Sequence, residues 1–291
     1  MALLGLQDPA PFSVFNANCS SNLLFTSDHN GSAIPTKLQN LGVPLNELRR
    51  HVAYDIGIDS VAHALSARFN APLIVANYSR LVIDCNRHPG AAGSIPSVSD
   101  KTVVVGNKNL SDDDTISRKN EIFDAYHSSI SRQISVMRNE NKNPILISLH
   151  SFTPVISGQF RPWEIGILWK DDRRLSAPLI KKLSEQKELQ FINHSVDETL
   201  DDKGVDVKIN IYEGQKFTIE RINIVGNNVT NDSVIRGELD VDEGDPYSVL
   251  LVNRSINKLK SRKIFGKVEK IVTEASSPDI KVVEIIVQES A

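Results

Sequence analysis

The segment 79–87 brings together side chains that could hold a small anion. A short apolar run at 81–83 carries Arg80 at its start and the cluster Asp84-Cys85-Asn86-Arg87 at its end. The planar guanidinium group of arginine grips a carboxylate through two parallel hydrogen bonds. Two such groups beside one predicted buried strand indicate a pocket for a dicarboxylate or an amino-acid-like anion. The alternative is a pair of structural ion pairs with Asp84.

Two histidines follow predicted buried strands and could bind a metal ion. His29 comes shortly after the strand expected at 23–26, and His150 ends the strand expected at 144–149. Neutral imidazoles from separate loops are typical zinc ligands, usually completed by a carboxylate and an open position for water. The sequence contains no His-x-x-x-His pair. A surface role or a structural role for each histidine is therefore the competing interpretation.

A third group of polar residues follows a four-residue spacing. His51, Asp55, Asp59 and His63 would share one face of the helix expected over 52–69. A solvent-exposed polar stripe explains this spacing most simply. A metal-binding role requires Asp55 to point into the site instead.

These residues depend on a pattern of alternating strands and helices between residues 22 and about 187. The pattern predicts an α/β domain with a mostly parallel sheet. Residues 88–114 are expected to form a long loop, and helices are expected over 116–138 and 179–189. In such sheets, ligand-binding groups gather where the strands end. The candidate residues that fall at predicted strand ends are His29, Asp84, Asn86, Arg87 and His150.

The pattern changes near residue 190. Residues 205–211 alternate strictly between apolar and polar side chains, which is typical of a half-buried antiparallel strand. Further strands are expected over 217–225, 267–273 and 280–288, with helices over 232–239 and 246–262. This order of strand, helix, helix, strand, strand predicts a small α+β module.

Composition excludes several classes of protein. The 291 residues carry a formal charge of −3, so no overall field favours nucleic acid. Cys19 and Cys85 are too few for a disulfide framework or a thiolate metal site. No secretory signal and no transmembrane segment is recognisable, which predicts a cytoplasmic protein.

Four ordered motifs in the first part resemble the N-formylglutamate amidohydrolase family. They are residues 27–35 (SDHNGSAIP), 51–57 (HVAYDIG), 79–87 (SRLVIDCNR) and 148–154 (SLHSFTP). The resemblance covers residues 10–187. It implies an incomplete α/β domain of the zinc-carboxypeptidase-like class, because this family resembles a distant branch of that architecture.

The resemblance also implies roles for individual residues. His29 and His150 are expected to bind Zn²⁺, with Asp55 as the carboxylate partner, although Ser32 stands where carboxypeptidases usually have a glutamate. Asn86, Arg87 and Arg80 are expected to hold the carboxylate end of an N-acyl amino acid. The expected reaction is hydrolysis of a linear amide, as in the deformylation of N-formylglutamate.

The family's catalytic glutamate has no recognisable counterpart. Members continue through a further strand and a segment similar to Glu-Ile-Arg-Gln-Asp-Leu, which does not occur in this sequence. Glu185 and Glu188 belong instead to a lysine-rich predicted helix. We therefore expect a C-terminally truncated amidohydrolase domain with an unassigned general base and impaired activity.

Residues 215–291 resemble a POTRA module, a building block of the proteins that assemble outer-membrane barrels. The matching pieces are 217–227, 234–236, 243–247, 261–265 and 287–289. Residues 191–214 resemble the closing hairpin of a preceding, partial module. The resemblance implies binding of unfolded outer-membrane strands at the sheet edge, in the periplasm. The alternative for a single module is an inert spacer.

The two resemblances leave three interpretations of the whole chain. It is an impaired amidohydrolase joined to a POTRA module, or an assembly module that carries an inactive hydrolase remnant. A third possibility is a chimera of two unrelated genes, formed by recombination or by sequence assembly. The absence of a recognisable export signal motivates this third interpretation, because POTRA modules normally work in the periplasm.

Overall fold

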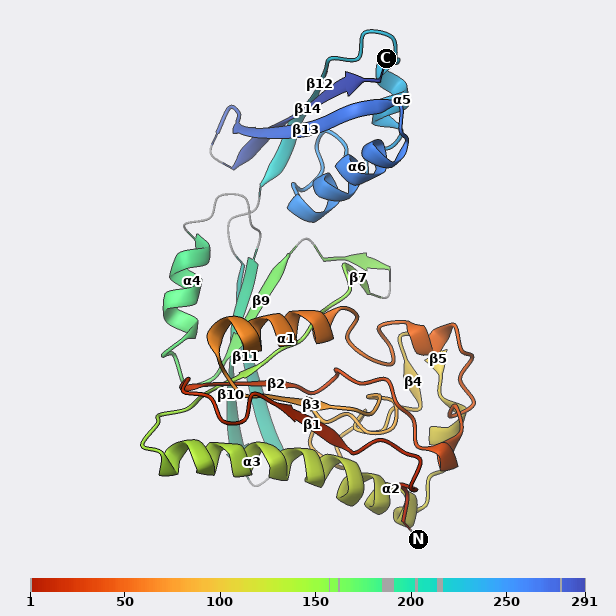
Figure 1. Cartoon of the computed structure of the whole chain (residues 1–291), viewed down its shortest axis with the longest axis vertical. Coiled ribbons are helices and arrows are strands. Elements are labelled where there is room, and N and C mark those ends of the chain that lie inside the picture. The colour runs from red at the N-terminus through yellow and green to blue at the C-terminus, as the bar shows by residue number, and fades with distance from the viewer. Residues whose placement is uncertain are drawn as a thin grey trace. The chain divides into compact units, whose positions relative to one another are not determined.

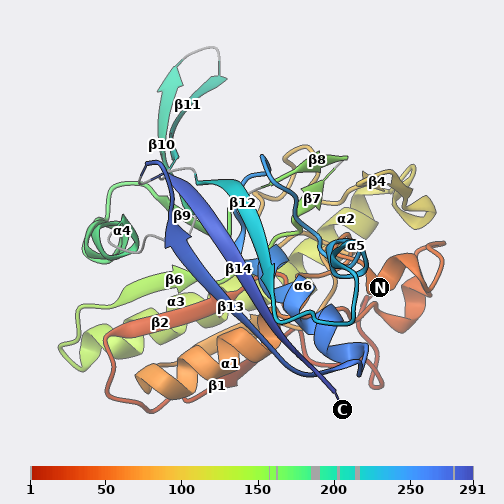
Figure 2. The ribbon, with the colours of Figure 1, turned by 90° about the horizontal axis from the view of Figure 1, so that it is seen from above.

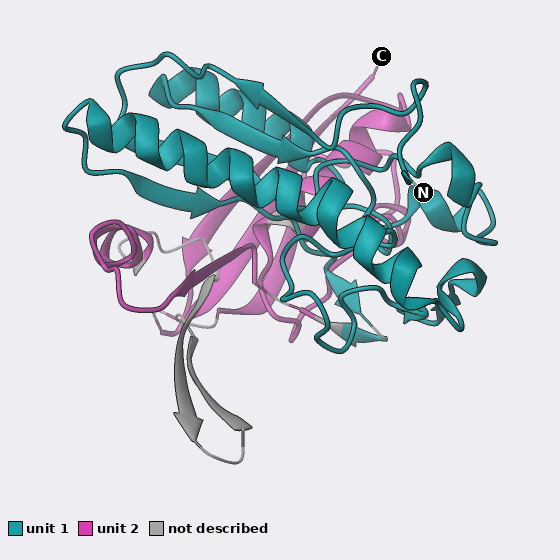
Figure 3. Ribbon diagram, turned by 90° about the horizontal axis from the view of Figure 1, so that it is seen from below, with its two compact units in different colours: residues 1–159 teal, residues 160–291 magenta. Residues whose placement is uncertain are grey.

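The computed structural model describes residues 2–156, 158–161, 163–184, 191–201, 204–213, 217–277 and 279–290. The chain divides into two compact units, residues 1–159 and residues 160–291, and each is described by itself (Figure 3). None of the helices in the described ranges combines the length and the apolar character needed to cross a membrane.

The first unit contains most of the alternating elements that the sequence predicts. In chain order they are β1 (Phe12–Phe15), β2 (Leu23–Ser27), η1 (Thr36–Leu38), η2 (Glu47–Arg49), α1 (Ile58–Phe69), β3 (Leu73–Ala76), β4 (Val98–Ser99), β5 (Thr102–Val103), η3 (Val105–Asn107), α2 (Asp112–Arg118), the π-helical turn η4 (Lys119–Phe123), α3 (Asp124–Asn139), β6 (Ile145–Ser148), β7 (Val155–Ile156) and β8 (Gln159–Phe160), which crosses the unit boundary.

The central sheet of this unit is mostly parallel, as predicted. Its strand order is β1-β3-β2-β6, with β3 and β6 both parallel to β2 and with β1 antiparallel to β3. Every residue of β3 is buried. A continuous apolar strand of this kind requires cover on both faces of the sheet.

The two faces belong to two hydrophobic clusters because successive side chains of a strand alternate. Leu73 and Val75 pack in a cluster that includes Ala62 of α1. Ile74 and Ala76 belong to the larger cluster, which includes residues of α3. Helices α1 and α3 accordingly lie on opposite faces of the sheet (Figure 1).

Two local predictions in this unit are wrong. Helix α1 begins at Ile58 rather than at residue 52, because Gly57 takes a left-handed conformation (φ 80°) at its N-cap. His51 and Asp55 therefore precede the helix, and the predicted polar stripe does not form. The apolar run 81–83 is not a strand but a buried turn, in which the Val82 N–H donates to the Ser79 carbonyl over 2.9 Å.

The predicted loop at 88–114 is more structured than expected. It contains β4, β5 and η3, and α2 begins within it at Asp112. Ser111 and Asp114 form a capping box there, and the run of three aspartates occupies the first turn, where the helix dipole favours negative charge. The helix predicted over 116–138 is divided into α2, η4 and α3.

The second unit contains two three-stranded sheets. Its elements are β9 (Ile165–Trp169), α4 (Ser176–Ser184), β10 (Phe191–Asp201), β11 (Gly204–Glu213), β12 (Thr218–Val225), α5 (Asp232–Arg236), α6 (Val249–Ser261), β13 (Phe265–Glu274) and β14 (Ile280–Glu289). Glu185 and Glu188 lie outside the described residues.

The last five elements have the predicted order of strand, helix, helix, strand, strand. Strands β12, β14 and β13 lie side by side, with β12 parallel and β13 antiparallel to the central β14 (Figure 2). Val283, Ile285 and Val287 alternate toward a buried core that includes Ile256 and Leu259 of α6. Helices α5 and α6 are shorter than predicted.

The other sheet has the order β11-β10-β9. Strands β10 and β11 pair antiparallel over 192–201 and 204–213, and β10 also runs parallel to β9. The interpretation of 191–214 as the hairpin of a partial POTRA module stays a prediction, as does the division of the chain at 187 and 215.

Candidate metal centre

The two candidate histidines come from neighbouring parallel strands. His29 follows the end of β2 by two residues, and His150 follows the end of β6 by two residues. Because Thr26 and Ser148 are register partners, these two strands end at the same edge of the sheet. The ring centroids of His29 and His150 lie 4.9 Å apart.

Asp55 joins this pair from the turn before α1. Its N–H donates to the carbonyl of His29 over 2.9 Å, which fixes the turn beside the histidine. Its Oδ1 atom lies 3.6 Å from Nδ1 of His29, and its Oδ2 atom lies 3.1 Å from Nδ1 of His150. One ligand atom from each of the three residues lies within 4.8 Å of the other two.

The donor set fits a divalent metal ion. Two imidazole nitrogens and a carboxylate oxygen form a ligand set that catalytic zinc sites use. Within the described part of the chain, Nδ1 of His29 is a buried polar atom with no hydrogen-bond partner. A buried polar atom of this kind is costly unless it has a partner, and a metal ion would supply one.

A second carboxylate contacts each histidine at Nε2, the ring nitrogen that does not face Asp55. Nε2 of His29 lies 2.7 Å from Oδ1 of Asp84, and Nε2 of His150 lies 3.2 Å from Oδ2 of Asp28. Such carboxylates fix the orientation of a metal-binding imidazole and strengthen it as a ligand. The sequence analysis missed this role of Asp28, although its position directly before His29 at a strand end was a usable signal.

The charges in the site shift the pKa values of its groups. Burial disfavours the charged form of His150, but hydrogen bonds and charges from Asp28 and Asp55 outweigh it and raise its pKa to about 9. The pKa of His29 is raised in the same way, with Asp55 and Asp84 outweighing burial. Burial opposes ionisation of Asp84, yet His29 and Arg80 lower its pKa to about 2. The site therefore holds ionised carboxylates.

The predicted anion-binding residues surround Asp84 rather than an open pocket. Nη2 of Arg80 lies 3.1 Å and Nε of Arg87 lies 3.3 Å from Oδ2 of Asp84, so the ion pairs considered as the alternative are present. Arg80 also places Nη1 3.5 Å from Oδ1 of Asp55. Asn86 is exposed, and its N–H donates to Oδ1 of Asp84 over 2.9 Å.

Two further residues, which the sequence analysis did not single out, bind the backbone of the buried turn at 81–83. The buried guanidinium of Arg118 donates to the Val82 carbonyl over 3.0 Å and to Oδ1 of Asn107 over 2.7 Å. Asn107 in turn donates to the Leu81 carbonyl over 2.7 Å. The backbone that carries Arg80 and Asp84 is therefore fixed by buried polar contacts.

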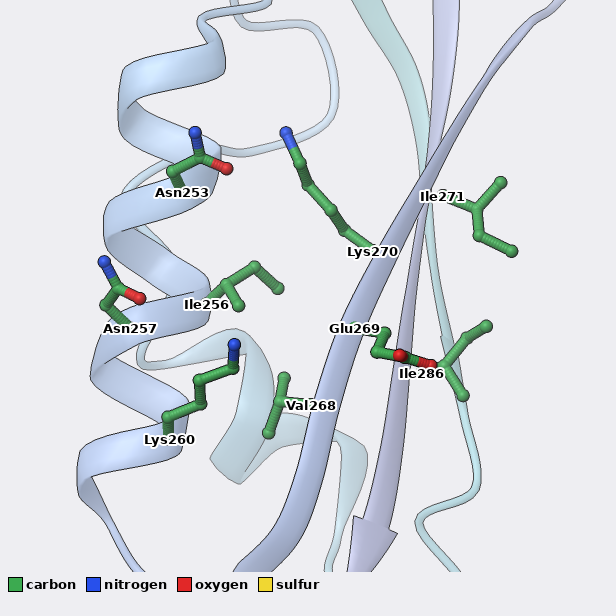
Figure 4. A pocket seen from close by; sticks show the side chains of 9 residues that line it. All are labelled: Asn253, Ile256, Asn257, Lys260, Val268, Glu269, Lys270, Ile271 and Ile286. Atoms are coloured by element: carbon green, nitrogen blue, oxygen red, sulfur yellow. The ribbon is translucent and has the colours of Figure 1, made fainter.

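A separate candidate site lies in the second unit, between α6 and β13. It is a groove of about 630 Å³. Ile256 and Lys260 of α6 face Val268 and Lys270 of β13 across it (Figure 4). Strand β13 lies at the edge of its sheet.

Comparison with known proteins relates both units to described families. Residues 21–201 match the model of the N-formylglutamate amidohydrolase family, and residues 217–290 match the POTRA model, which is described as a surface antigen variable number repeat. The outer membrane protein assembly factor BamA of Neisseria meningitidis serogroup B is 36% identical over 78 residues. That match takes in 26% of this chain and 10% of BamA, so the chain spans only a tenth of that relative.

A solved structure shares the fold. The crystal structure of a gene product from Agrobacterium tumefaciens superposes with a TM-score of 0.63 at 23% sequence identity, over 98% of this chain and 88% of that one. The amidohydrolase model covers more than half of the chain and includes all six candidate metal-binding and anion-binding residues. The chain therefore belongs to the N-formylglutamate amidohydrolase family, and in it an amidohydrolase domain is fused to a POTRA domain.

Proposed function

We propose that the chain binds Zn²⁺ through His29, Asp55 and His150 and hydrolyses the amide of N-formylglutamate or a related N-acyl amino acid. The observation that carries this proposal is the ligand set itself. Three donor atoms converge within 4.8 Å, and both imidazoles are supported by carboxylates. The family supports a hydrolytic reaction on a linear amide.

Zinc in a site of this kind supplies a Lewis acid for an amide carbonyl and lowers the pKa of water. The chain's own residues then have to orient the substrate. Arg80 and Arg87 would hold its carboxylate end, with Asn86 beside them. Both arginines are partly exposed, and both contact Oδ2 of Asp84. They can therefore turn toward an incoming carboxylate while Oδ1 of Asp84 keeps its hydrogen bond to His29.

The sequence lacks the motif that carries the family's catalytic glutamate, so we expect turnover well below that of members that have it. Metal binding is the first requirement of the proposal. It can be tested separately from turnover, because it does not depend on that glutamate.

Zinc content and turnover of N-formylglutamate test this function together. We expect one Zn²⁺ per chain in the wild type and loss of the metal in His29→Ala. His63→Ala is the matched control, because this histidine is partly exposed on α1 and its Nδ1 contacts the Asp59 carbonyl instead of the triad. A wild type without zinc and without amide hydrolysis would refute the proposal.

We propose a second function for the POTRA domain: binding of an extended apolar peptide along β13. The supporting observation is the groove beside this edge strand, since an edge strand offers backbone groups for strand addition and a groove can take alternate side chains. In the outer-membrane assembly machinery such a domain would work in the periplasm.

Filling the groove tests this second function. Asn257→Trp introduces a large ring between α6 and β13, and Val234→Trp places the same ring at an exposed position on α5. We expect only Asn257→Trp to weaken binding of an alternating apolar peptide, measured by fluorescence anisotropy on the full chain. Equal binding by both variants would contradict the proposed site.

A further inference from the structure

The π-helical turn η4 places three residues of the α2–α3 segment on the same buried face. Arg118, Ile122 and Tyr126 are spaced four residues apart, and all three are essentially fully buried. In a regular α-helix, each step of four would rotate the side chain by about 40° around the axis. The wider π turn keeps the three residues on one face. It therefore allows one helical segment to supply both Arg118 and Tyr126 to the core.

Tyr126 contacts the carboxylate that supports His150. Its hydroxyl donates to Oδ1 of Asp28 over 2.7 Å. The other oxygen of Asp28 accepts from the hydroxyl of Ser148 over 2.7 Å and lies 3.2 Å from Nε2 of His150. Both oxygens of Asp28 are thus held, and Asp28 itself is only 7% exposed.

We infer that Tyr126 is a positioning residue of the metal centre, which acts through Asp28 to keep Nδ1 of His150 facing Asp55. The inference rests on the proposed metal site. A carboxylate bound through only one oxygen can rotate, and its rotation would move the imidazole that it supports. With Tyr126 on one oxygen and Ser148 on the other, Asp28 has a fixed plane. This arrangement prepares the ring of His150 before a metal ion arrives.

Zinc affinity of the metal-free full chain, measured by competition with a chromophoric chelator, tests the inference. At pH 9, where a proton on His150 competes least with the metal ion, we expect Asp28→Asn to weaken zinc binding by about 10–100-fold and Tyr126→Phe by about 10-fold, the range typical of residues that support metal ligands. Tyr78→Phe is the matched control. Tyr78 is also a buried tyrosine, at 2% exposure, and its hydroxyl donates to the Pro9 carbonyl over 2.6 Å, outside the triad.

The double variant separates positioning from general destabilisation. If Tyr126 acts through Asp28, the affinity of Asp28→Asn/Tyr126→Phe should equal that of Asp28→Asn alone. The visible absorption spectrum of the Co²⁺-loaded protein should change in Tyr126→Phe but not in Tyr78→Phe. Both results would support the inference.

Three outcomes would overturn it. A wild type that binds no zinc removes the metal site, and with it this inference. A wild type that binds zinc, together with equal affinities for Tyr126→Phe and Tyr78→Phe, leaves the metal site intact but excludes the role of Tyr126. Full additivity in the double variant excludes the path through Asp28. If Asp28→Asn does not fold, the comparison of the two tyrosine variants still decides the question.

Discussion

Zinc affinity should rise steeply with pH between 7 and 9, because the metal ion has to replace a proton on His150. Asp28 and Asp55 raise the pKa of this histidine to about 9 in the metal-free site. Zinc binds the neutral imidazole only. The same two carboxylates that prepare the site therefore also stabilise the proton that competes with the metal.

The size of the effect follows from this pKa. At pH 7 about one molecule in 100 has a neutral His150, and at pH 9 about half of the molecules do. The apparent affinity should therefore increase by about 50-fold over these two pH units, and about one proton should be released per Zn²⁺ bound at pH 7. The raised pKa of His29 adds to the slope in the same direction.

The metal-free protein should show the opposite trend in stability. A group whose pKa is raised by folding stabilises the folded state below its unfolded pKa, and this contribution is lost as pH rises through the folded pKa. For His150 the window runs from pH 6.5 to about 9. Allowing for the partial exposure of its side chain, we expect a loss of about 1–2 kcal/mol across this window.

Isothermal titration calorimetry in buffers of different ionisation enthalpy measures the affinity and the proton release together, and thermal unfolding of the metal-free protein measures the second trend. Asp28→Asn should shift the rise in affinity to lower pH, because it removes one of the two charges that hold the proton. An affinity that stays constant from pH 7 to 9, with no proton release, would refute this account of the site.

Three other predictions concern the framework around the site. Arg118→Met removes the donor to two buried acceptors and should lower the free energy of unfolding by about 2–4 kcal/mol. Arg132→Met, at an exposed position, is the control and should change this free energy little. Equal denaturant midpoints for the two variants would contradict the prediction. Gly31→Ala would place its Cβ 2.0 Å from the Asn77 carbonyl oxygen, so we expect a loss of about 3 kcal/mol or more, and an unchanged melting temperature would exclude this contact. Because β6 is an edge strand that exposes an apolar side chain, Leu146 at 51%, we expect the protein to self-associate through it. Leu146→Lys should reduce this self-association in sedimentation experiments without lowering stability, and unchanged association would exclude this strand as the contact.

The placement of His29 and His150 could be predicted because it depends on strand order alone. Each follows a short apolar run, and apolar runs that alternate with helices form parallel sheets whose ends meet. The placement of Asp55 could not be predicted in the same way. Apolar residues at helical spacing continue back to Val52, so periodicity places the start of the helix too early. The start of α1 is set by the left-handed conformation of Gly57 at its N-cap.

Asp28 and Tyr126 show a different limit of sequence reasoning. They lie 98 positions apart in the chain, and their contact depends on a π turn that has no periodic signal in the sequence. Asp84 was recognisable as a partner of the arginines from local spacing alone. Its bond to His29 was not, because it joins a buried turn to a strand end 55 residues away.

Asp84 connects the two halves of the proposed site. Its Oδ1 atom contacts His29 and the Asn86 N–H, and its Oδ2 atom contacts Arg80 and Arg87. A bound anion that draws the arginines away from Asp84 would leave this buried carboxylate with fewer cations besides His29 to interact with. A carboxylate with fewer cationic partners is a stronger acceptor for the imidazole, and a stronger acceptor makes that imidazole a better metal ligand. Binding of a carboxylate at the arginines and binding of a metal ion at the histidines should therefore favour one another, since both act on this one buried residue.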